Sequence, residues 1–307
     1  MPAVRVALEP EPAEYAARAV EEGGGVVVAL EDRPDALVWT APGDWSGIGP
    51  VLARAPGVRW VQLPFAGVEG VSETGVLTGE RTWTCAKGVY SEPVAEHALA
   101  LALAGLRSLP RHARSRTWGR QAARSLYDER VVVLGGGGIT ETLLALLQPF
   151  RVDVTVVRRD ADRAVPGAQR TAPLSALDQV LPGALVVFLA LALTDETRGV
   201  LGADQLARMD PDAWLVNVAR GAHVDTDALV EALRAERIGG AALDVTDPEP
   251  LPDGHPLWDL PNCLVTPHTA NPWRTAQPRL ARRIADNVAR LGRGEPLIGT
   301  VDVAAGY

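Results

Sequence analysis

The sequence is poor in cysteine. Only two thiols, Cys85 and Cys263, occur among its 307 residues. Two cysteines so far apart give no disulfide framework, which indicates a reducing compartment such as the cytoplasm. The first residues lack the charged and long apolar regions of a signal peptide, and no apolar run reaches the length of a membrane span. We therefore expect a cytoplasmic protein with no membrane partner.

An excess of basic charge is also absent. The formal net charge is −8, and phosphate backbones bind basic surfaces, so nucleic acid is excluded as the main partner. The five histidines show no ligand spacing such as H-E-x-x-H or C-x-x-C, so we predict no metal site. The chain has 47% hydrophobic and 22% charged residues and a length typical of two domains, which indicates a globular protein.

Strand-like apolar runs recur through the chain. They cover 4–8, 26–30, 37–40, 58–63, 131–134, 152–157, 185–191, 213–218, 240–243 and 263–266. Most are continuous rather than alternating, as in strands that are buried on both faces of a parallel sheet. Helix-like stretches separate them, so the sequence predicts an α/β fold.

One helix is well marked, at 93–109. Pro93 suits a first helical turn, and alanine and leucine dominate after it. Because this stretch is apolar nearly all round, we predict a buried helix that acts as a rod joining two domains. The segment 107–124 then carries six arginines and no acidic residue. This composition favours a solvated or subunit-contacting face, and the alternative is a rim that attracts anions.

A glycine loop follows the strand at 131–134, in the sequence VVVLGGGGIT. A strand, a glycine loop and a helix in this order form the context of a Rossmann dinucleotide site. Gly135 would make the tight turn, and Gly137 would let the backbone approach the pyrophosphate at the positive end of the helix expected over 141–148. Gly138 and Ile139 are further candidate cofactor contacts. Thr140 stands where the third glycine of the fingerprint is usual, which predicts a slightly wider approach of helix and strand. The alternative is a plain strand–helix turn.

The end of the next strand indicates which dinucleotide is preferred. NAD sites usually place an acidic residue there, about 20 residues after the first glycine, to hold the ribose hydroxyl. Here Arg158 and Arg159 follow the strand 152–157. A guanidinium can clamp a phosphate with two hydrogen bonds. The sequence therefore predicts NADP(H) over NAD(H), although Asp160 remains as a ribose contact for NAD.

Seven motifs follow one another between about residues 60 and 270. They are FAGVEG at 65–70, VAEHALAL at 94–101, GGGGIT at 135–140, LTDETRG at 193–199, VNVARG at 216–221, GAALDVTDPEPLP at 240–252 and PNCLVTPH at 261–268. Each is common alone, but in this order and spacing the chain resembles the D-isomer-specific 2-hydroxyacid dehydrogenases, of the glyoxylate and hydroxypyruvate reductase kind. The first 60 residues match that family only in pattern.

The resemblance implies three catalytic residues. Arg220 is the substrate-binding arginine, Glu249 is the carboxylate that partners the histidine, and His268 is the acid–base. The residue types suit the chemistry, because a guanidinium holds a carboxylate and a carbonyl oxygen in one plane. A histidine near its normal pKa can give a proton to the alkoxide that forms when hydride arrives. His97 is interpreted as a packing residue at the domain junction.

The same resemblance implies further contacts. Asp244 would hold the nicotinamide carboxamide, with Val218 and Ala219 beside the cofactor. The backbone N–H groups of Ala66 and Gly67 would bind the substrate carboxylate.

The resemblance also implies the architecture and the reaction. We expect two Rossmann-like or flavodoxin-like parallel-sheet domains with a cleft between them. A discontinuous substrate domain would comprise 1–94 and 275–307, a dinucleotide-binding Rossmann domain would comprise 95–274, and the protein would be a homodimer. The reaction would transfer a hydride between NAD(P)H and a small 2-oxo acid, giving a D-2-hydroxy acid.

Two alternatives remain open for the function. One is a formate- or phosphite-type dehydrogenase of the same superfamily. The other is a non-catalytic protein that senses dinucleotides. The presence of all three catalytic residues argues against lost catalysis.

Overall fold

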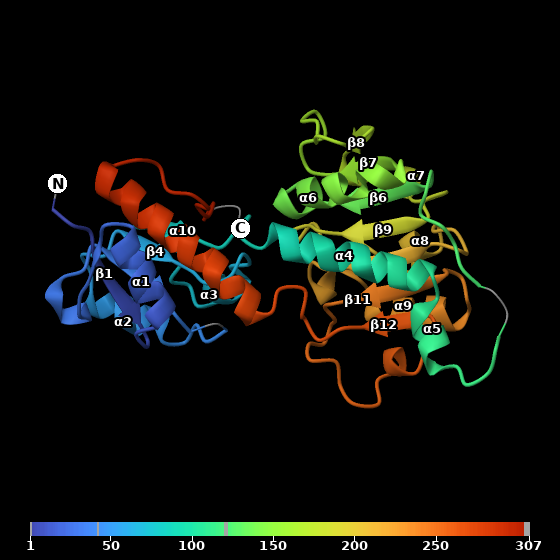
Figure 1. Ribbon diagram of the computed structural model, residues 1–307, viewed down its shortest axis with the longest axis horizontal. Coiled ribbons are helices and arrows are strands. Elements are labelled where there is room, and N and C mark those ends of the chain that lie inside the picture. The colour runs from blue at the N-terminus through green and yellow to red at the C-terminus, as the bar shows by residue number, and fades with distance from the viewer. Residues whose placement is uncertain (1, 42, 120–121, 304–307) are drawn as a thin grey trace. The chain divides into compact units, whose positions relative to one another are not determined.

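The computed structural model describes residues 2–41, 43–119 and 122–303. The chain divides into two compact units (Figure 1). Unit 1 comprises Met1–Tyr90 and Pro272–Tyr307, and unit 2 comprises Ser91–Asn271. Each is built on one sheet in which the described neighbouring strands run parallel. The prediction of two parallel-sheet α/β domains is confirmed.

Unit 1 contains a five-stranded sheet in the order β2-β1-β3-β4-β5. The strands are β1 (Arg5–Glu9), β2 (Val26–Val27), β3 (Ala36–Trp39), β4 (Trp60–Gln62) and β5 (Thr82–Thr84). The helices are α1 (Glu14–Glu22), α2 (Ile48–Arg54), α3 (Glu69–Glu73) and α10 (Trp273–Arg293). Three tryptophans, Trp39, Trp60 and Trp83, are fully buried in this unit. Their aromatic area supplies much of its core.

A buried polar network attaches the last helix to this sheet. The Asn287 side chain on α10 donates to Gln62 Oε1 at 3.2 Å and accepts from the Ile298 N–H at 2.8 Å. Thr84 donates to the same Gln62 oxygen at 2.8 Å, and Trp60 Nε1 donates to Thr84 Oγ1 at 2.7 Å. Because these groups satisfy one another, burying them carries little penalty and fixes how α10 packs. Helix α10 therefore belongs to unit 1 although it comes last in sequence.

Unit 2 contains a seven-stranded sheet in the order β12-β11-β10-β9-β6-β7-β8. Read from β8, this is the Rossmann order 3-2-1-4-5-6 extended by one strand. The strands are β6 (Arg130–Leu134), β7 (Asp153–Val157), β8 (Arg170–Ala172), β9 (Val186–Leu189), β10 (Trp214–Asn217), β11 (Gly240–Leu243) and β12 (Cys263–Val265). The chain turns from β6 to β7 on one side and reaches β9 on the other, so the glycine loop after β6 lies at the topological switch point.

Helices connect the strands of this sheet (Figure 1). The helices are α4 (Ser91–Leu106), α5 (Leu109–Arg114), α6 (Gly138–Leu147), α7 (Leu177–Val180), α8 (Ala203–Leu206) and α9 (Thr226–Arg234). The 3-10 turns are Gln148–Phe150, Leu174–Ala176, Gly221–His223 and Pro256–Trp258 in unit 2, and Leu30–Asp32 in unit 1. Helix α4 packs against α6, β10 and β11. None of the described helices is both long and apolar enough to cross a membrane.

The helix predicted over 93–109 ends earlier than expected at its C-terminus. Helix α4 ends at Leu106, Ser108 takes the left-handed backbone conformation with φ 52°, and α5 begins at Leu109. Pro110 explains the break. In a continued helix it would have no N–H to donate to the Leu106 carbonyl, and its ring would clash with that carbonyl. The Leu106 carbonyl accepts from the Arg124 N–H at 2.8 Å instead. Arg120, part of the arginine-rich segment, lies outside the described residues.

Candidate active site

A histidine–carboxylate pair lies at the carboxyl ends of two neighbouring strands of unit 2. His268 follows β12, and Glu249 lies in the proline-rich loop after β11. His268 Nδ1 lies 2.6 Å from Glu249 Oε1, the distance of a charge-assisted hydrogen bond. Since the proton on Nδ1 is shared with Glu249, Nε2 is the ring atom left to exchange a proton with a substrate.

The two groups shift each other's pKa. The hydrogen bond that His268 donates to Glu249 raises the pKa of His268 above its usual value, against the effect of partial burial. Burial alone would raise the pKa of Glu249, but the hydrogen bond and charge of His268 outweigh it and lower the pKa of this carboxyl. The pair therefore favours an imidazolium beside a carboxylate, and the imidazolium can act as a proton donor.

Asp244 organises the turn that follows β12. It directly follows β11, and its side chain is only 2% exposed. Its Oδ1 accepts from Thr266 Oγ1 at 2.6 Å and from the Thr269 N–H at 2.8 Å, and its Oδ2 accepts from the Ala270 N–H at 3.0 Å. Burial alone would raise the pKa of Asp244, but these bonds, with one from His97, lower it to about 2. Asp244 is thus a buried anion that is well paired.

The backbone of His268 is held in an uncommon conformation. Its φ is 47°, in the left-handed region that residues with a side chain rarely adopt. The His268 N–H donates to the Asp244 carbonyl at 2.8 Å. Asp244 therefore accepts hydrogen bonds from the successive N–H groups of His268, Thr269 and Ala270. These bonds fix the direction of the His268 side chain.

His97 joins this arrangement, although it was predicted only as a packing residue. It lies on α4, and its Nε2 is 3.1 Å from Thr266 Oγ1 and 3.3 Å from Asp244 Oδ1. The sequence motif VAEHALAL contains this histidine, but neither its spacing nor its composition identifies Asp244 as a partner 147 positions away. The signal appears only when α4 packs beside β11 and β12.

Arg220 follows β10, the strand next to β11. Its Nη1 donates to the Ala219 carbonyl at 2.7 Å, and its charge acts on both Glu249 and His268. The loops come close because residue 221 is glycine, since a Cβ there would overlap the backbone of Thr246. Three adjacent strands, β10, β11 and β12, thus bring the three predicted catalytic residues to one edge of the sheet.

The glycine loop has the geometry of a phosphate cradle. Gly135 has φ 109°, and a Cβ there would overlap the Ala190 carbonyl, so only glycine fits. Gly137 precedes α6, and a Cβ on it would meet nothing within 4 Å. The first N–H groups of α6, from Gly138 and Ile139, are therefore approachable at the positive end of the helix. These residues fit a dinucleotide pyrophosphate.

Thr140 occupies the position of the missing third glycine without opening the loop. It is fully buried, and its Oγ1 donates to the Gly135 carbonyl at 2.9 Å. The hydroxyl thus ties the first turn of α6 to the start of the loop.

Arg158 and Arg159 follow β7, beside the loop that follows β6. A Cβ on Gly136 would lie 3.1 Å from three atoms of the Arg158 side chain, so this side chain lies over the loop. Its Nη1 donates to the Arg163 carbonyl at 3.2 Å. Arg159 and Asp160 are exposed.

The remaining predicted contacts belong to different units. Val218 and Ala219 are nearly buried and follow β10 in unit 2. Ala66 and Gly67 follow β4 in unit 1, and neither N–H donates to another described residue.

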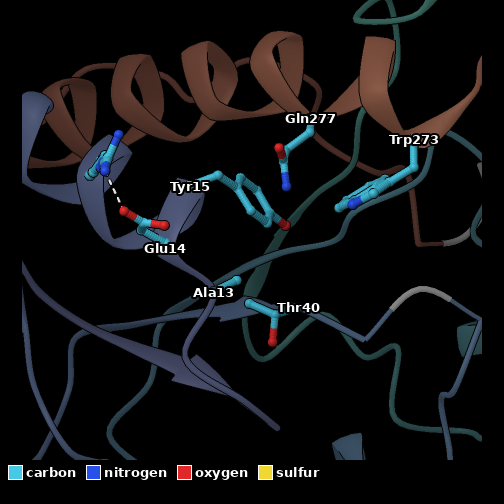
Figure 2. Close-up of a pocket in the computed structure, with 7 residues that line it drawn as sticks. Ala13, Glu14, Tyr15, Thr40, Trp273 and Gln277 are labelled. Atoms are coloured by element: carbon cyan, nitrogen blue, oxygen red, sulfur yellow. Dashed lines mark hydrogen bonds and ion pairs between the residues drawn. The ribbon is translucent and has the colours of Figure 1, made fainter.

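Unit 1 also contains a cavity of about 390 Å³ (Figure 2). It is lined by Ala13, Glu14, Tyr15, Arg18, Thr40, Trp273 and Gln277. The rings of Tyr15 and Trp273 meet nearly edge to face, with centroids 5.6 Å apart. Glu14 pairs with Arg18, and Thr40 Oγ1 donates to the Glu9 carbonyl at 2.9 Å. The cavity thus combines aromatic and polar side chains, and none of the predicted site residues lines it.

Comparison with known proteins places this site in a family. Residues 97–270 match the model of the NAD binding domain of D-isomer specific 2-hydroxyacid dehydrogenases. An uncharacterized protein from the proB 3′ region of Corynebacterium melassecola is 38% identical over 297 residues, which cover 94% of this chain and 95% of that protein.

Two solved structures extend the comparison to the whole fold. A D-isomer specific 2-hydroxyacid dehydrogenase from Xanthobacter autotrophicus Py2, in complex with NADPH and MES, is 29% identical with a TM-score of 0.86 and full coverage of both chains. An NADPH-dependent glyoxylate/hydroxypyruvate reductase from Sinorhizobium meliloti, in complex with NADP and sulfate, is 25% identical with a TM-score of 0.82 and 99% coverage of both chains.

The chain belongs to the D-isomer specific 2-hydroxyacid dehydrogenase family, as its motifs implied. It is therefore an NAD(P)-dependent oxidoreductase of 2-hydroxy acids.

Proposed function

We propose that this protein is an NADPH-dependent reductase of small 2-oxo acids, which it converts to D-2-hydroxy acids. The observation that carries the proposal is the 2.6 Å contact between His268 and Glu249, beside Arg220 and on the same sheet as a glycine cradle. A carbonyl reduction needs these parts: a cation for the substrate, a proton donor and a dinucleotide site.

The proposed roles follow from the positions of the side chains. Arg220 binds the carboxylate and the carbonyl oxygen of the substrate and stabilises the charge that develops on that oxygen. The nicotinamide cofactor, when bound, would supply the hydride for the carbonyl carbon. His268 gives the proton on Nε2 to the oxygen, and Glu249 stabilises the imidazolium before the transfer. In oxidation, neutral His268 accepts the proton again.

Other residues have binding roles in this proposal. Asp244 would hold the nicotinamide carboxamide, and Val218 and Ala219 would also contact the cofactor. The free N–H groups of Ala66 and Gly67 would hold the substrate carboxylate. Unit 1 would then be the substrate domain and unit 2 the dinucleotide domain.

The preference for NADPH rests on charge. Arg158 and Arg159 supply two cations where a 2′-phosphate would lie, next to the glycine loop. The similar proteins from Xanthobacter and Sinorhizobium were solved with NADPH and NADP, which supports the same choice.

Glyoxylate and hydroxypyruvate are the proposed substrates, by analogy with the Sinorhizobium enzyme. The test is a panel of glyoxylate, hydroxypyruvate, pyruvate, phenylpyruvate and branched 2-oxo acids, each with NADPH and with NADH. Reduction of the first two with NADPH supports the proposal. Activity only with formate or phosphite would establish the one-centre dehydrogenase alternative. Tight NADPH binding without any turnover would establish a sensing protein.

We also propose a cytoplasmic homodimer that uses the arginine-rich segment as a contact. Within it, Trp118 is 102% exposed and Leu109 is 54% exposed. Large apolar side chains in water at a surface often mark a protein contact. Light scattering on the wild type and on a Trp118→Ser variant tests this, and a monomeric wild type would refute it.

A further inference from the structure

His97 links α4 to the ends of two strands. Its imidazole is 21% exposed, and Nε2 points at both Thr266 Oγ1, 3.1 Å away, and Asp244 Oδ1, 3.3 Å away. Helix α4 packs against β11 and β12, so the ring bridges a helix and the two loops that leave these strands.

The hydrogen bonds fix which atom of His97 carries a proton. The Thr266 hydroxyl gives its hydrogen to Asp244 Oδ1 at 2.6 Å, so its oxygen offers only lone pairs to His97. Asp244 Oδ1 is an acceptor as well. Nε2 of His97 must therefore be the donor, and one N–H is shared between the two oxygens.

One of the two oxygens that His97 contacts, Asp244 Oδ1, also accepts the Thr269 N–H in the turn of His268. Asp244 accepts the N–H groups of His268, Thr269 and Ala270, through its carbonyl, Oδ1 and Oδ2 respectively. Because His268 has a left-handed backbone, this turn depends on its surroundings to stay in place. A shift of Asp244 would move the His268 ring relative to Glu249.

We propose that His97 is a positioning residue, which holds Asp244 and Thr266 and through them the turn that aims His268 at Glu249. The inference rests on the proposed acid–base role of His268 and assigns a role to a side chain outside the Arg220, Glu249 and His268 set. His97 acts on the reaction only through the geometry of that turn.

The test compares His97→Ala with His97→Gln in the full chain. Glutamine keeps an N–H donor at nearly the reach of Nε2, whereas alanine keeps none. Glu96→Ala is the control, because Glu96 is the exposed neighbour on the same helix. Two quantities are measured: kcat and KM for glyoxylate reduction with NADPH, and the titration midpoint of the His268 ring in proton–nitrogen NMR spectra.

His97→Ala should lower kcat roughly tenfold, as is typical when an orienting hydrogen bond is removed. The His268 titration should move to lower pH, because its bond to Glu249 loosens. His97→Gln should restore most of the kcat and most of the His268 titration midpoint. Glu96→Ala should match the wild type in both quantities.

Two results would overturn the inference. One is an unchanged His268 titration in His97→Ala. The other is a loss of activity that follows only the folded fraction in a thermal melt, with glutamine no better than alanine. The NMR titration needs no turnover. If the wild type reduces no 2-oxo acid, the proposed function fails, and the titration still decides the role of His97.

Discussion

Glu249 Oε1 lies 2.6 Å from His268 Nδ1, although 19 residues separate the two in sequence. The loop after β11 and the turn after β12 each contribute one partner, and the parallel pairing of these strands brings their ends together. The bond raises the pKa of His268 and favours its protonated form. The behaviour of the enzyme with pH should follow from this pair.

The first prediction concerns the pH profile of reduction. In the proposed mechanism reduction needs protonated His268, so kcat should be flat at low pH and fall as pH rises through the pKa of His268. Because Glu249 raises that pKa, the fall should come at higher pH than for an isolated imidazole. In Glu249→Gln the charge is gone, so the descending limb should move to lower pH, and kcat at pH 8 should drop roughly tenfold or more.

Glu231→Gln is the matched control for this profile, since Glu231 forms an exposed pair with Arg234 on α9. Its profile should overlay that of the wild type. A descending limb that stays in place in Glu249→Gln would show that the carboxylate does not set the pKa that controls turnover.

The second prediction concerns the proton donor itself. Replacing His268 with Ala should reduce kcat roughly a hundredfold or more, because general acid catalysis contributes about 10²–10⁴. Cofactor affinity should stay nearly unchanged, since the glycine cradle is intact. Stopped-flow turnover and NADPH fluorescence titration measure the two quantities. Wild-type turnover in this variant would remove His268 from the mechanism.

The fold was predictable where strands are long and apolar. Strands β6 and β7 appear as runs of valine, and buried parallel strands need such runs on both faces. Strands β5 (Thr82–Thr84) and β8 (Arg170–Ala172) escaped prediction, because each has only three residues and neither is an apolar run. Without an apolar run, a strand of this length has no pattern that distinguishes it from a loop.

The candidate site was predictable to a similar, partial degree. The glycine loop and the motifs around Arg220, Glu249 and His268 are local in sequence and could be read directly. The contact of His97 with Asp244 could not be predicted, because no local feature of a histidine in an apolar helix indicates which residue it will contact. Only the packing of α4 beside β11 brings them within 3.3 Å.

The third prediction concerns cofactor choice. The double variant Arg158→Ala and Arg159→Ala should raise the KM for NADPH about tenfold to a hundredfold, because a hydrogen bond to a charged group contributes about 1.5–3 kcal/mol. The KM for NADH should change little, since NADH has no 2′-phosphate. Arg151→Ala is the control, because Arg151 precedes β7 at the opposite end of the strand and pairs with Asp128. Equal effects on both cofactors would contradict a phosphate contact.

The fourth prediction separates folding from cofactor binding within the glycine loop. Gly135→Ala should destabilise unit 2 by about 1–3 kcal/mol or more, because φ is 109° and the new Cβ would overlap the Ala190 carbonyl.

Gly137→Ala has an ordinary φ of −96° and open space around the Cβ, so the protein should fold with nearly the same melting temperature. The added methyl group would nevertheless occupy the space through which the pyrophosphate approaches α6. NADPH affinity in Gly137→Ala should therefore fall roughly tenfold or more, although stability is kept. Differential scanning calorimetry and fluorescence titration on the two variants measure both quantities. Normal NADPH binding in Gly137→Ala would show that the cofactor does not lie against this loop.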